Sequence, residues 1–188
     1  MKYHTEPYID NLVSKDCASA GYFKLSDFDI SGYDYKIKII GFIGYSPGGP
    51  ADIYVTSKET EQNGMYVPSC NPYNNWQGKD YGPKHWHINN SYPYYDDCNV
   101  CDDNWNYKMD VDKFWCIYHY TDIYTPFPFS DEPSYTKIIN SLTWIPKEHI
   151  WVKGVGGYPM NWCMHCVIVY WGTVVENTSL GDIKALFR

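Results

Sequence analysis

The stretch DYKIKIIGFIGYSPGGPADIYVTSK, residues 34–58, decides the fold class of this chain. In its first half, side chains alternate between two faces. Lys36, Lys38 and Ile40 belong to one face, and Ile37, Ile39 and Gly41 belong to the other. After this point both faces are apolar. A period of two residues is typical of a β-strand. Pro and Gly residues at 47–50 suit a turn, so the sequence predicts a hairpin over residues 35–57.

Further strand patterns follow later in the chain, at KFWCIYHY (113–120), SLTWI (141–145), HIWVKGV (149–155) and CMHCVIVYWGTVV (163–175). Strands without helices between them favour antiparallel pairing. We therefore expect a mainly β protein, an antiparallel β-sandwich with helices at its ends. Its 188 residues suit a single domain, 1–188, whose last part, 113–188, holds the remaining strands and a final helix.

Two helices are expected at the ends of the sandwich. Residues 1–21 suit a helical arm that Thr5 caps and Gly21 ends, with apolar residues on one face. Ser179 and Asp182 form a capping box for a short C-terminal helix. Between the hairpin and the later strands, residues 58–112 show little periodicity and are rich in Asn, Gly, Pro, Tyr and Trp, which is typical of an interaction segment.

The charged residues exclude some function classes. The net charge is -7, and of the 15 basic residues only Arg188 is an arginine. Nucleic-acid recognition depends on arginine for bidentate phosphate and base contacts, so we do not expect that partner. No apolar run approaches the ~20 residues of a membrane-spanning helix, and no apolar leader stands at the N-terminus, so we expect a protein made in the cytosol that contacts no membrane.

The same residues predict an unusual response to alkali. Lysine and tyrosine both titrate around pH 10, whereas arginine stays charged. In strong base the lysines become neutral, and 22 carboxylates and 20 phenolates face one arginine. Such self-repulsion opposes any compact or assembled state.

Two C-x-x-C motifs, Cys98/Cys101 and Cys163/Cys166, raise the question of a metal site. The gap of 61 residues between them is longer than in compact four-cysteine zinc sites. Residues three apart on a strand also point to opposite faces. We therefore interpret Cys116, Cys163 and Cys166 as buried small hydrophobic residues. For Cys98 and Cys101, a disulfide or a metal clamp stays open.

Other residues of catalytic or metal-binding type form no convincing constellation. His85 and His87 share one side of an expected strand, but residues 88–95 contain no carboxylate, so we predict no metal centre. His119, Glu148 and His149 are interpreted as ordinary hydrogen-bonded residues. No G-x-S-x-G motif or phosphate-binding loop is present. We expect no enzyme and no required cofactor.

Aromatic residues are the remaining signal, with 20 Tyr, 8 Trp and 7 Phe. Tyr and Trp are enriched at interfaces because they combine a large rigid contact area with a polar group. Two main functions are therefore open. One is a self-assembling structural protein, and the other is a glycan-binding module with Trp76, Trp86 and Trp105 as stacking platforms. A small structural-zinc protein is a third alternative.

Three stretches carry a family resemblance: YKIKIIGFIGYSPGGPADIYVTSK (35–58), LTWIPKEHIWVKGVGGYP (142–159) and CMHCVIVYWGTVVENT (163–178). Together they resemble the polyhedrins of cypoviruses, the matrix proteins of insect-virus occlusion bodies, as a short divergent member. The resemblance implies trimers that join into a crystal lattice around virus particles in the cytoplasm of the infected cell. It also implies dissolution of the lattice in an alkaline gut, and a possible nucleotide whose site is unknown.

The stretch SYPYYDDCNVC, residues 91–101, is the predicted pH-sensitive contact. Burial raises the pKa of a phenol, so a contact made of tyrosines should persist until strongly alkaline pH. New phenolates at Tyr92, Tyr94 and Tyr95 would then repel Asp96 and Asp97. Cys98 and Cys101 would clamp the end of this segment.

Overall fold

The computed structural model describes residues 1, 8–9, 15–30, 34–45, 51–86, 97–101, 107–109, 111–121, 127–128, 130–131 and 139–171. Within these ranges the chain forms antiparallel β-strands and one short 3-10 helix, Leu25–Phe28, but no α-helix. None of the described helical structure has the length and apolar character needed to cross a membrane. The mainly β, antiparallel prediction is confirmed for this part of the chain.

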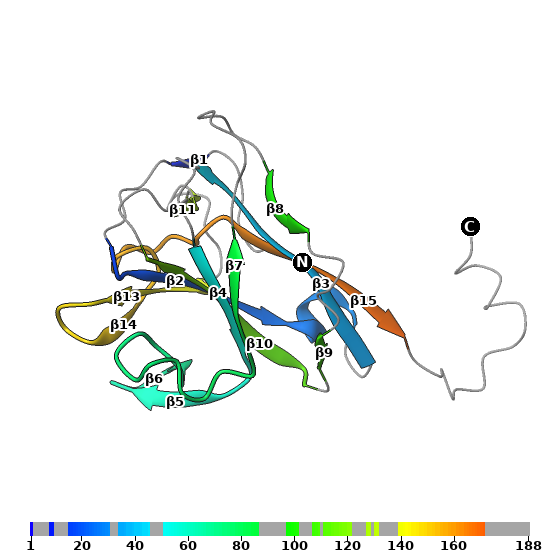
Figure 1. The fold of residues 1–188 in the computed structure, drawn as a ribbon, viewed down its shortest axis with the longest axis horizontal. Helices are drawn as coiled ribbons and strands as arrows, with labels where there is room; N and C mark the ends of the chain where they lie inside the picture. The colour runs from blue at the N-terminus through cyan, green and yellow to red at the C-terminus, as the bar shows by residue number, and fades with distance from the viewer. Residues whose placement is uncertain are drawn as a thin grey trace, which may run out of the picture.

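A six-stranded antiparallel sheet forms the larger layer (Figure 1). Its strands in spatial order are β14 (Ile150–Lys153), β13 (Ser141–Ile145), β2 (Ala18–Lys24), β10 (Lys113–Tyr120), β4 (Ala51–Thr56) and β7 (Tyr81–Trp86). The two strands predicted at 113–120 and 141–145 match β10 and β13 residue for residue. The β10 strand pairs with β2 on one side and with β4 on the other, and so lies inside the sheet.

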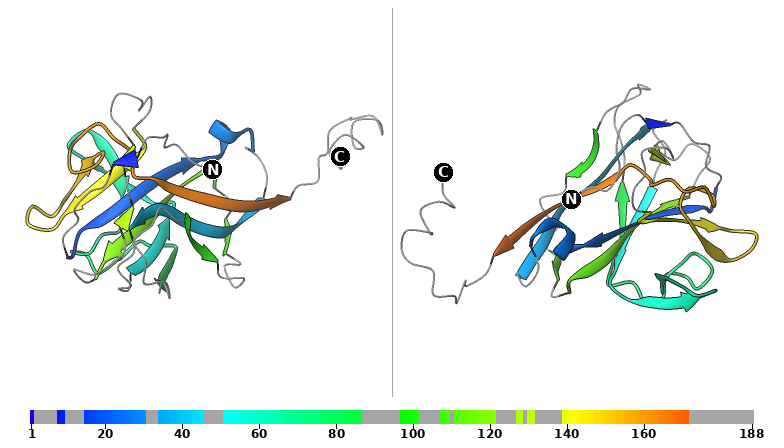
Figure 2. Two further views of the ribbon diagram at one scale, coloured as in Figure 1. Left: turned by 90° about the horizontal axis from the view of Figure 1, so that it is seen from above. Right: turned by 180° about the vertical axis from the view of Figure 1, so that it is seen from behind.

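A second sheet is built around the long strand β3 (Asp34–Tyr45). Its other strands are β8 (Asp97–Cys101), β9 (Tyr107–Met109), β11 (Phe127–Pro128) and β15 (Met164–Trp171), each of which pairs with β3. Figure 2 shows β3 and β15 running side by side along this layer. Two smaller pairs complete the fold: β1 (Tyr8–Ile9) with β12 (Ser130–Asp131), and β5 (Glu59–Gln62) with β6 (Met65–Pro68).

The space between the two sheets holds the first hydrophobic core. Phe23, Ile53 and Phe114 enter it from the six-stranded sheet, while Tyr35 and Cys166 enter it from the second sheet. All five side chains are buried. Close packing of apolar side chains from both layers holds the sheets together, because burying each large side chain contributes roughly 1.5–3 kcal/mol.

A second core covers the outer face of the six-stranded sheet. Along β10 the side chains alternate: Phe114 and Cys116 belong to the first core, whereas Trp115 and Ile117 belong to the second. The second core is closed by Val67 and other residues of the segment that contains the β5–β6 hairpin. Figure 1 shows this hairpin beside the sheet, next to β4 and β10. The sheet is therefore covered on both faces, and nearly all of β10 is buried.

The predicted helical arm at residues 1–21 is wrong wherever the structure describes it. Tyr8–Ile9 forms β1, and Ala18–Lys24 forms β2, which pairs with both β10 and β13. Gly21, the expected end of the helix, lies inside β2, where a Cβ atom would come within 3.4 Å of Met164 Sδ. Pairing with two distant strands overrides the local helical spacing of the apolar residues.

The prediction of two strands around the Pro/Gly turn is confirmed, but their pairing as a hairpin over 35–57 is wrong. β3 and β4 lie in different sheets, where β3 pairs with β15 and β4 pairs with β10 and β7. The connection therefore passes from one layer to the other. The alternation in the sequence shows that each segment is a strand, but the partner is chosen by packing between the layers.

The segment 58–112 is more regular than predicted. Its described part contains β5, β6, β7, β8 and β9, strands of three to six residues that are too short to show a clear period. The strands predicted near 149–155 and 163–175 are confirmed as β14 and β15. The predicted C-terminal helix lies outside the described residues.

Candidate functional site

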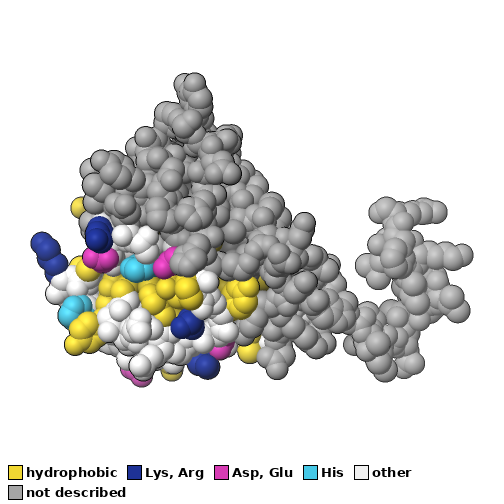
Figure 3. All heavy atoms as spheres, in the orientation of Figure 1, with side chains coloured by type: hydrophobic (Ala, Val, Ile, Leu, Met, Phe, Trp, Pro, Cys, Tyr) yellow, Lys and Arg dark blue, Asp and Glu magenta, His cyan; other side chains and the backbone are white. Residues whose placement is uncertain are grey.

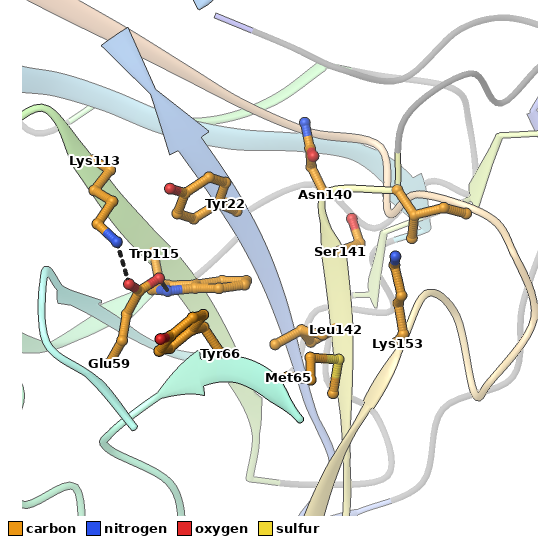
Figure 4. A pocket seen from close by; sticks show the side chains of 11 residues that line it. Tyr22, Glu59, Met65, Tyr66, Lys113, Trp115, Asn140, Ser141, Leu142 and Lys153 are labelled. Carbon is orange, nitrogen blue, oxygen red and sulfur yellow. Dashed lines mark hydrogen bonds and ion pairs between the residues drawn. The ribbon is translucent and has the colours of Figure 1, made fainter. Parts of the chain in front are cut away.

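A groove with a volume of about 280 Å³ lies where the β5–β6 hairpin meets the six-stranded sheet (Figure 4). We call it the tyrosine groove. Its lining combines aromatic, apolar and charged side chains: Tyr22, Glu59, Met65, Tyr66, Lys113, Trp115, Ile139, Asn140, Ser141, Leu142 and Lys153. Small-molecule sites range from about 300 to 1,000 Å³, so this groove is slightly smaller than that range.

Trp115 forms the floor of the tyrosine groove. Its indole is 5% exposed and lies between Tyr22 and Tyr66, as Figure 4 shows. The ring centroids of Tyr22 and Trp115 are 4.9 Å apart and the rings are tilted by 50°. The indole Nε1–H donates a hydrogen bond of 3.1 Å to Glu59 Oε1, so the one polar atom of this side chain is satisfied. The floor is therefore rigid.

Charged groups stand at both ends of the groove. Lys113 forms an ion pair with Glu59 Oε2 at one end, and Lys153 lies at the other end in Figure 4. The hydrogen bond to Glu59 raises the pKa of Lys113. Burial raises the pKa of Tyr22, an effect that the nearby Lys113 charge partly opposes. Glu59 thus accepts from two donors, the indole of Trp115 and the ammonium group of Lys113.

Three tyrosines are the large apolar side chains that protrude from the described part of the chain. Tyr66 is 67% exposed, Tyr73 is 71% exposed and Tyr158 is 66% exposed. Tyr66 borders the tyrosine groove, and Tyr73 borders a second hollow next to His149. An exposed tyrosine combines apolar contact area with a hydroxyl, which is the composition found at protein interfaces.

Tyr158 is presented by a tight turn. Val155 N donates to Tyr158 O at 3.1 Å, and Tyr158 N donates to Val155 O at 3.0 Å. Between them Gly156 and Gly157 both have positive φ, 59° and 93°, which a two-residue turn of this kind requires. The ring of Tyr158 therefore projects from a fixed backbone, and little conformational entropy is lost when it is buried.

A second group of tyrosines is buried. Tyr35, Tyr54, Tyr118 and Tyr120 are each 4% exposed or less. Tyr35 donates to Val111 O at 2.9 Å, and the hydroxyls of Tyr120 and Ser19 lie 2.6 Å apart in a hydrogen bond. Burial raises the pKa of Tyr120, and burial together with Asp52 raises the pKa of Tyr54. All four side chains belong to the fold, and Tyr54 and Tyr120 resist ionisation.

The predicted pH-sensitive contact falls largely outside the described residues, which include neither Tyr92, Tyr94 and Tyr95 nor Asp96. The backbone of Asp97, Cys98 and Cys101 is described and forms β8. There Cys98 is opposite Phe42 and Cys101 is opposite Ile39 of β3. The C-terminal part of the predicted stretch, residues 97–101, is therefore a strand of the second sheet.

The interpretation of three cysteines as buried hydrophobic residues is confirmed, because Cys116, Cys163 and Cys166 are all 0% exposed. Cys116 hydrogen-bonds to Cys166 across the first core, and burial raises the pKa of the Cys116 thiol. Among the described residues, no group of three or more His, Cys, Asp or Glu side chains has the arrangement of a metal site.

Two other predictions need correction. His119 is not an ordinary hydrogen-bonded residue, because both of its ring nitrogens are buried without a hydrogen-bond partner. Trp76 is not an exposed stacking platform, because it is 6% exposed and stacks on Tyr54 at a centroid distance of 3.9 Å. Trp105 lies outside the described residues, and Trp86 is described only as a backbone position in β7.

Sequence reasoning missed Tyr22, Tyr66 and Tyr158. One signal was present for Tyr158, since two glycines between apolar residues are typical of a tight hairpin turn. Tyr22 and Tyr66 come from β2 and β6, which are distant in sequence. No local pattern indicates that these strands would border one groove.

No protein-family model matches this chain, and no curated protein or solved structure matches it.

Proposed function

We propose that this chain is a structural protein, not an enzyme, that assembles with copies of itself through tyrosine contacts. The assembly is a viral occlusion-body matrix that is stable near neutral pH and dissolves in alkali. One observation carries the proposal: in the described part of the chain, the large apolar side chains that protrude into solvent are all tyrosines, Tyr66, Tyr73 and Tyr158.

These side chains suit the centre of a protein contact. Interface energy concentrates in a few aromatic or arginine anchors that fill well-packed pockets. Arginine is nearly missing from this sequence, which leaves tyrosine and tryptophan as anchors. The tyrosine groove supplies a concave surface, while Tyr158 on its tight turn supplies a convex one. Together they support contacts between copies of the chain.

The two groups of tyrosines support the alkaline step. Phenols lose their proton around pH 10 in water, and burial delays this ionisation. In the fold, burial raises the pKa of Tyr54 and Tyr120, so these phenols stay neutral at a pH at which solvated phenols ionise. As the pH rises, charge repulsion would therefore separate the copies of the chain at their surface contacts before it unfolds the core. An intact chain would be released.

We propose that the fold is an antiparallel β-sandwich, because its two sheets share one hydrophobic core. The resemblance to cypovirus polyhedrins supports trimers, embedded virus particles and occlusion bodies in the cytoplasm of infected cells. The short β1–β12 pair stands where the sequence predicted a helical arm. Assembly through a helix of residues 1–21 is therefore not part of the proposal.

The proposal is tested by expressing the chain alone in insect cells and examining the cells for micron-sized crystals. Purified particles are then placed in carbonate buffer of rising pH, and turbidity and near-ultraviolet circular dichroism are measured together. We expect particles at neutral pH and cooperative dissolution above about pH 10, with the circular dichroism of the folded chain retained at first. A chain that stays soluble and monomeric at neutral pH would refute the proposal, as would particles that persist in strong base.

The same assay tests the stretch 91–97. Replacement of Tyr92, Tyr94 and Tyr95 by phenylalanine should raise the dissolution pH, because phenylalanine cannot ionise beside Asp96 and Asp97. The matched control is Tyr35→Phe, which removes a titratable phenol from the core and should leave the dissolution pH unchanged. If the triple variant dissolves at the original pH, this stretch is not the pH-sensitive contact.

A further inference from the structure

A second hollow, of about 380 Å³, lies between the segment 72–76 and the six-stranded sheet. We call it the aromatic hollow. It is lined by Asp16, Pro72, Tyr73, Asn75, Trp76, His119, Trp144, Pro146 and His149. Figure 3 shows one face of the molecule on which apolar side chains gather in a band with histidine beside them. The volume is within the usual range of small-molecule sites, about 300 to 1,000 Å³.

Backbone strain is concentrated around this hollow. Six non-glycine residues among those described have positive φ, and four of them line the hollow: Asp16, Asn75, Trp76 and His149. This conformation is unfavourable for side chains with a Cβ, above all for a bulky residue such as Trp76. Residues in such conformations persist only where the surrounding structure holds them, and they cluster at binding sites. The strain therefore marks this wall as a candidate site.

The aromatic rings of the hollow are fixed by one another. Trp76 stacks on Tyr54 at 3.9 Å, with an interplanar angle of 13°, and meets the ring of His119 edge-on at 5.0 Å. At the rim, Tyr73 stacks on His149 at 4.0 Å with an angle of 24°. Tyr73 and His149 are exposed, whereas Trp76 and Trp144 are buried. The hollow thus has an accessible flat rim above an indole wall.

His119 is the unsatisfied polar group of the hollow. Both ring nitrogens are buried and lack a hydrogen-bond partner, which is costly for a polar group. Burial lowers the pKa of His119, although the charges of Asp52 and Asp16 oppose this effect, so the neutral ring is favoured near pH 7. A neutral imidazole has one donor and one acceptor. A turn about its Cβ–Cγ bond exchanges carbon and nitrogen positions and would present a nitrogen to a ligand.

We propose that the aromatic hollow binds a neutral carbohydrate, with a sugar ring packed on the Tyr73–His149 rim and its hydroxyls bonded to Asp16, Asn75 and His119. A hydroxyl both donates and accepts, and so matches carboxylate, amide and neutral imidazole alike. The C–H face of a sugar ring packs on aromatic faces. This binding activity is additional to self-assembly, although both proposals use the exposed ring of Tyr73.

The charges near the hollow disfavour an anionic ligand. Neither lysine nor arginine lines it within the described part of the chain, while Asp16 does. A quaternary ammonium ligand would fit aromatic rings near a carboxylate. Such a ligand could not satisfy the ring nitrogens of His119, however, because it has neither a donor nor an acceptor. The unpartnered imidazole is therefore the observation that favours a hydroxyl-bearing ligand.

The experiment is saturation-transfer NMR on the full chain with N,N′-diacetylchitobiose, lactose, maltose and tetramethylammonium as probes. Saturation transfer works on large particles as well as on soluble protein, so assembly does not prevent the measurement. We expect at least one sugar to bind at concentrations up to about 10 mM, well above a Kd of about 1 mM, with quenching or a shift of tryptophan fluorescence. Absence of binding by all three sugars, or binding of tetramethylammonium alone, would overturn the proposal.

Variants locate the site. Tyr73→Ala and His149→Gly should each weaken sugar binding about tenfold, and glycine suits the positive φ of His149. The matched control is Tyr158→Ala, which removes a tyrosine that is 66% exposed, against 71% for Tyr73, and does not line the hollow. Thermal unfolding of each variant establishes that it is folded. Equal loss of binding in all three variants, or in none, would exclude the aromatic hollow as the site.

Discussion

The side-chain amide of Gln62 hydrogen-bonds to both backbone groups of Trp151. Gln62 Nε2 donates to Trp151 O at 2.8 Å, and Trp151 N donates to Gln62 Oε1 at 3.2 Å. Trp151 lies on β14, the outermost strand on one side of the described six-stranded sheet. Gln62 therefore takes the place that a neighbouring strand would occupy. It fixes the β5–β6 hairpin to the sheet and occupies part of an edge that would otherwise be open to other chains.

Replacement of Gln62 by leucine should destabilise the fold by about 1–3 kcal/mol, because it leaves two backbone groups of Trp151 without partners. The measurement is the free energy of unfolding in urea, together with amide hydrogen exchange at Trp151, which should become faster. The control is Glu61→Leu at the exposed neighbouring position, with an expected change within about 0.5 kcal/mol. Equal effects of the two substitutions would show that the amide does not protect this edge.

Glu59 should stabilise the tyrosine groove through Trp115 more than through Lys113. Glu59→Gln keeps an acceptor for the indole N–H and loses only an ion pair near the surface, so we expect a cost below about 1 kcal/mol. Glu59→Leu leaves the indole N–H unpaired and should cost about 1–3 kcal/mol. Urea unfolding of both variants is the measurement. A larger loss for glutamine than for leucine would contradict this assignment.

Tyr120 should contribute to alkaline unfolding. Burial raises the pKa of Tyr120, so above pH 10 the unfolded chain binds fewer protons at this residue than the folded chain does. The free energy of unfolding should therefore fall as pH rises above 10, by up to about 1.4 kcal/mol per pH unit for each such tyrosine, until the folded phenol also ionises.

Tyr120→Phe tests this effect. The variant should lose about 1 kcal/mol at neutral pH, because the hydrogen bond with Ser19 is removed, but its stability should decline less steeply above pH 10. Urea unfolding at neutral pH gives the first quantity, and unfolding at about pH 9, 10 and 11, on both sides of the usual phenol pKa of about 10, gives the second. Tyr158→Phe, at an exposed position, is the control. Parallel curves for Tyr120→Phe and the unmodified chain would exclude this contribution.

Tyr158 should act in assembly through its ring at neutral pH and through its hydroxyl in alkali. Tyr158→Ala removes the ring and should raise the concentration at which particles form by about tenfold or more. Tyr158→Phe keeps the ring, so particles should form normally and dissolve at a higher pH. Light scattering against concentration and pH measures both effects. If the alanine variant assembles normally, Tyr158 is not a contact residue.

Gly154 should position the turn that presents Tyr158. Its φ is +72°, and a Cβ atom there would lie 1.9 Å from Tyr158 O. Gly154→Ala should therefore destabilise the fold and weaken assembly. Gly156 is a matched control, because its φ is also positive but a Cβ atom would meet nothing within 4 Å. Gly156→Ala should cost only about 1 kcal/mol. Unfolding and particle formation of the two variants are compared directly.

Local periodicity in the sequence was sufficient to predict several strands. KFWCIYHY and SLTWI coincide with β10 and β13, because β-branched and aromatic residues in short runs favour the extended backbone. The composition alone shows the surplus of tyrosines. It did not separate Tyr120, which is buried, from Tyr158, which is exposed. That difference depends on tertiary position, since Tyr120 lies on β10 inside the sheet whereas Tyr158 lies on a turn that projects into solvent.

Tertiary structure decided which strands pair and which residues come together. Ala18–Lys24 is a strand because β10 and β13 bind its two edges, although the sequence prediction placed residues 18–21 in a helix. β3 and β4 are neighbours in sequence but lie in separate sheets. The aromatic hollow combines Asp16, Trp76, His119 and His149, which no spacing in the sequence connects. Sequence patterns report the backbone that each segment prefers, whereas partners are set by burial of apolar faces between segments far apart in the chain.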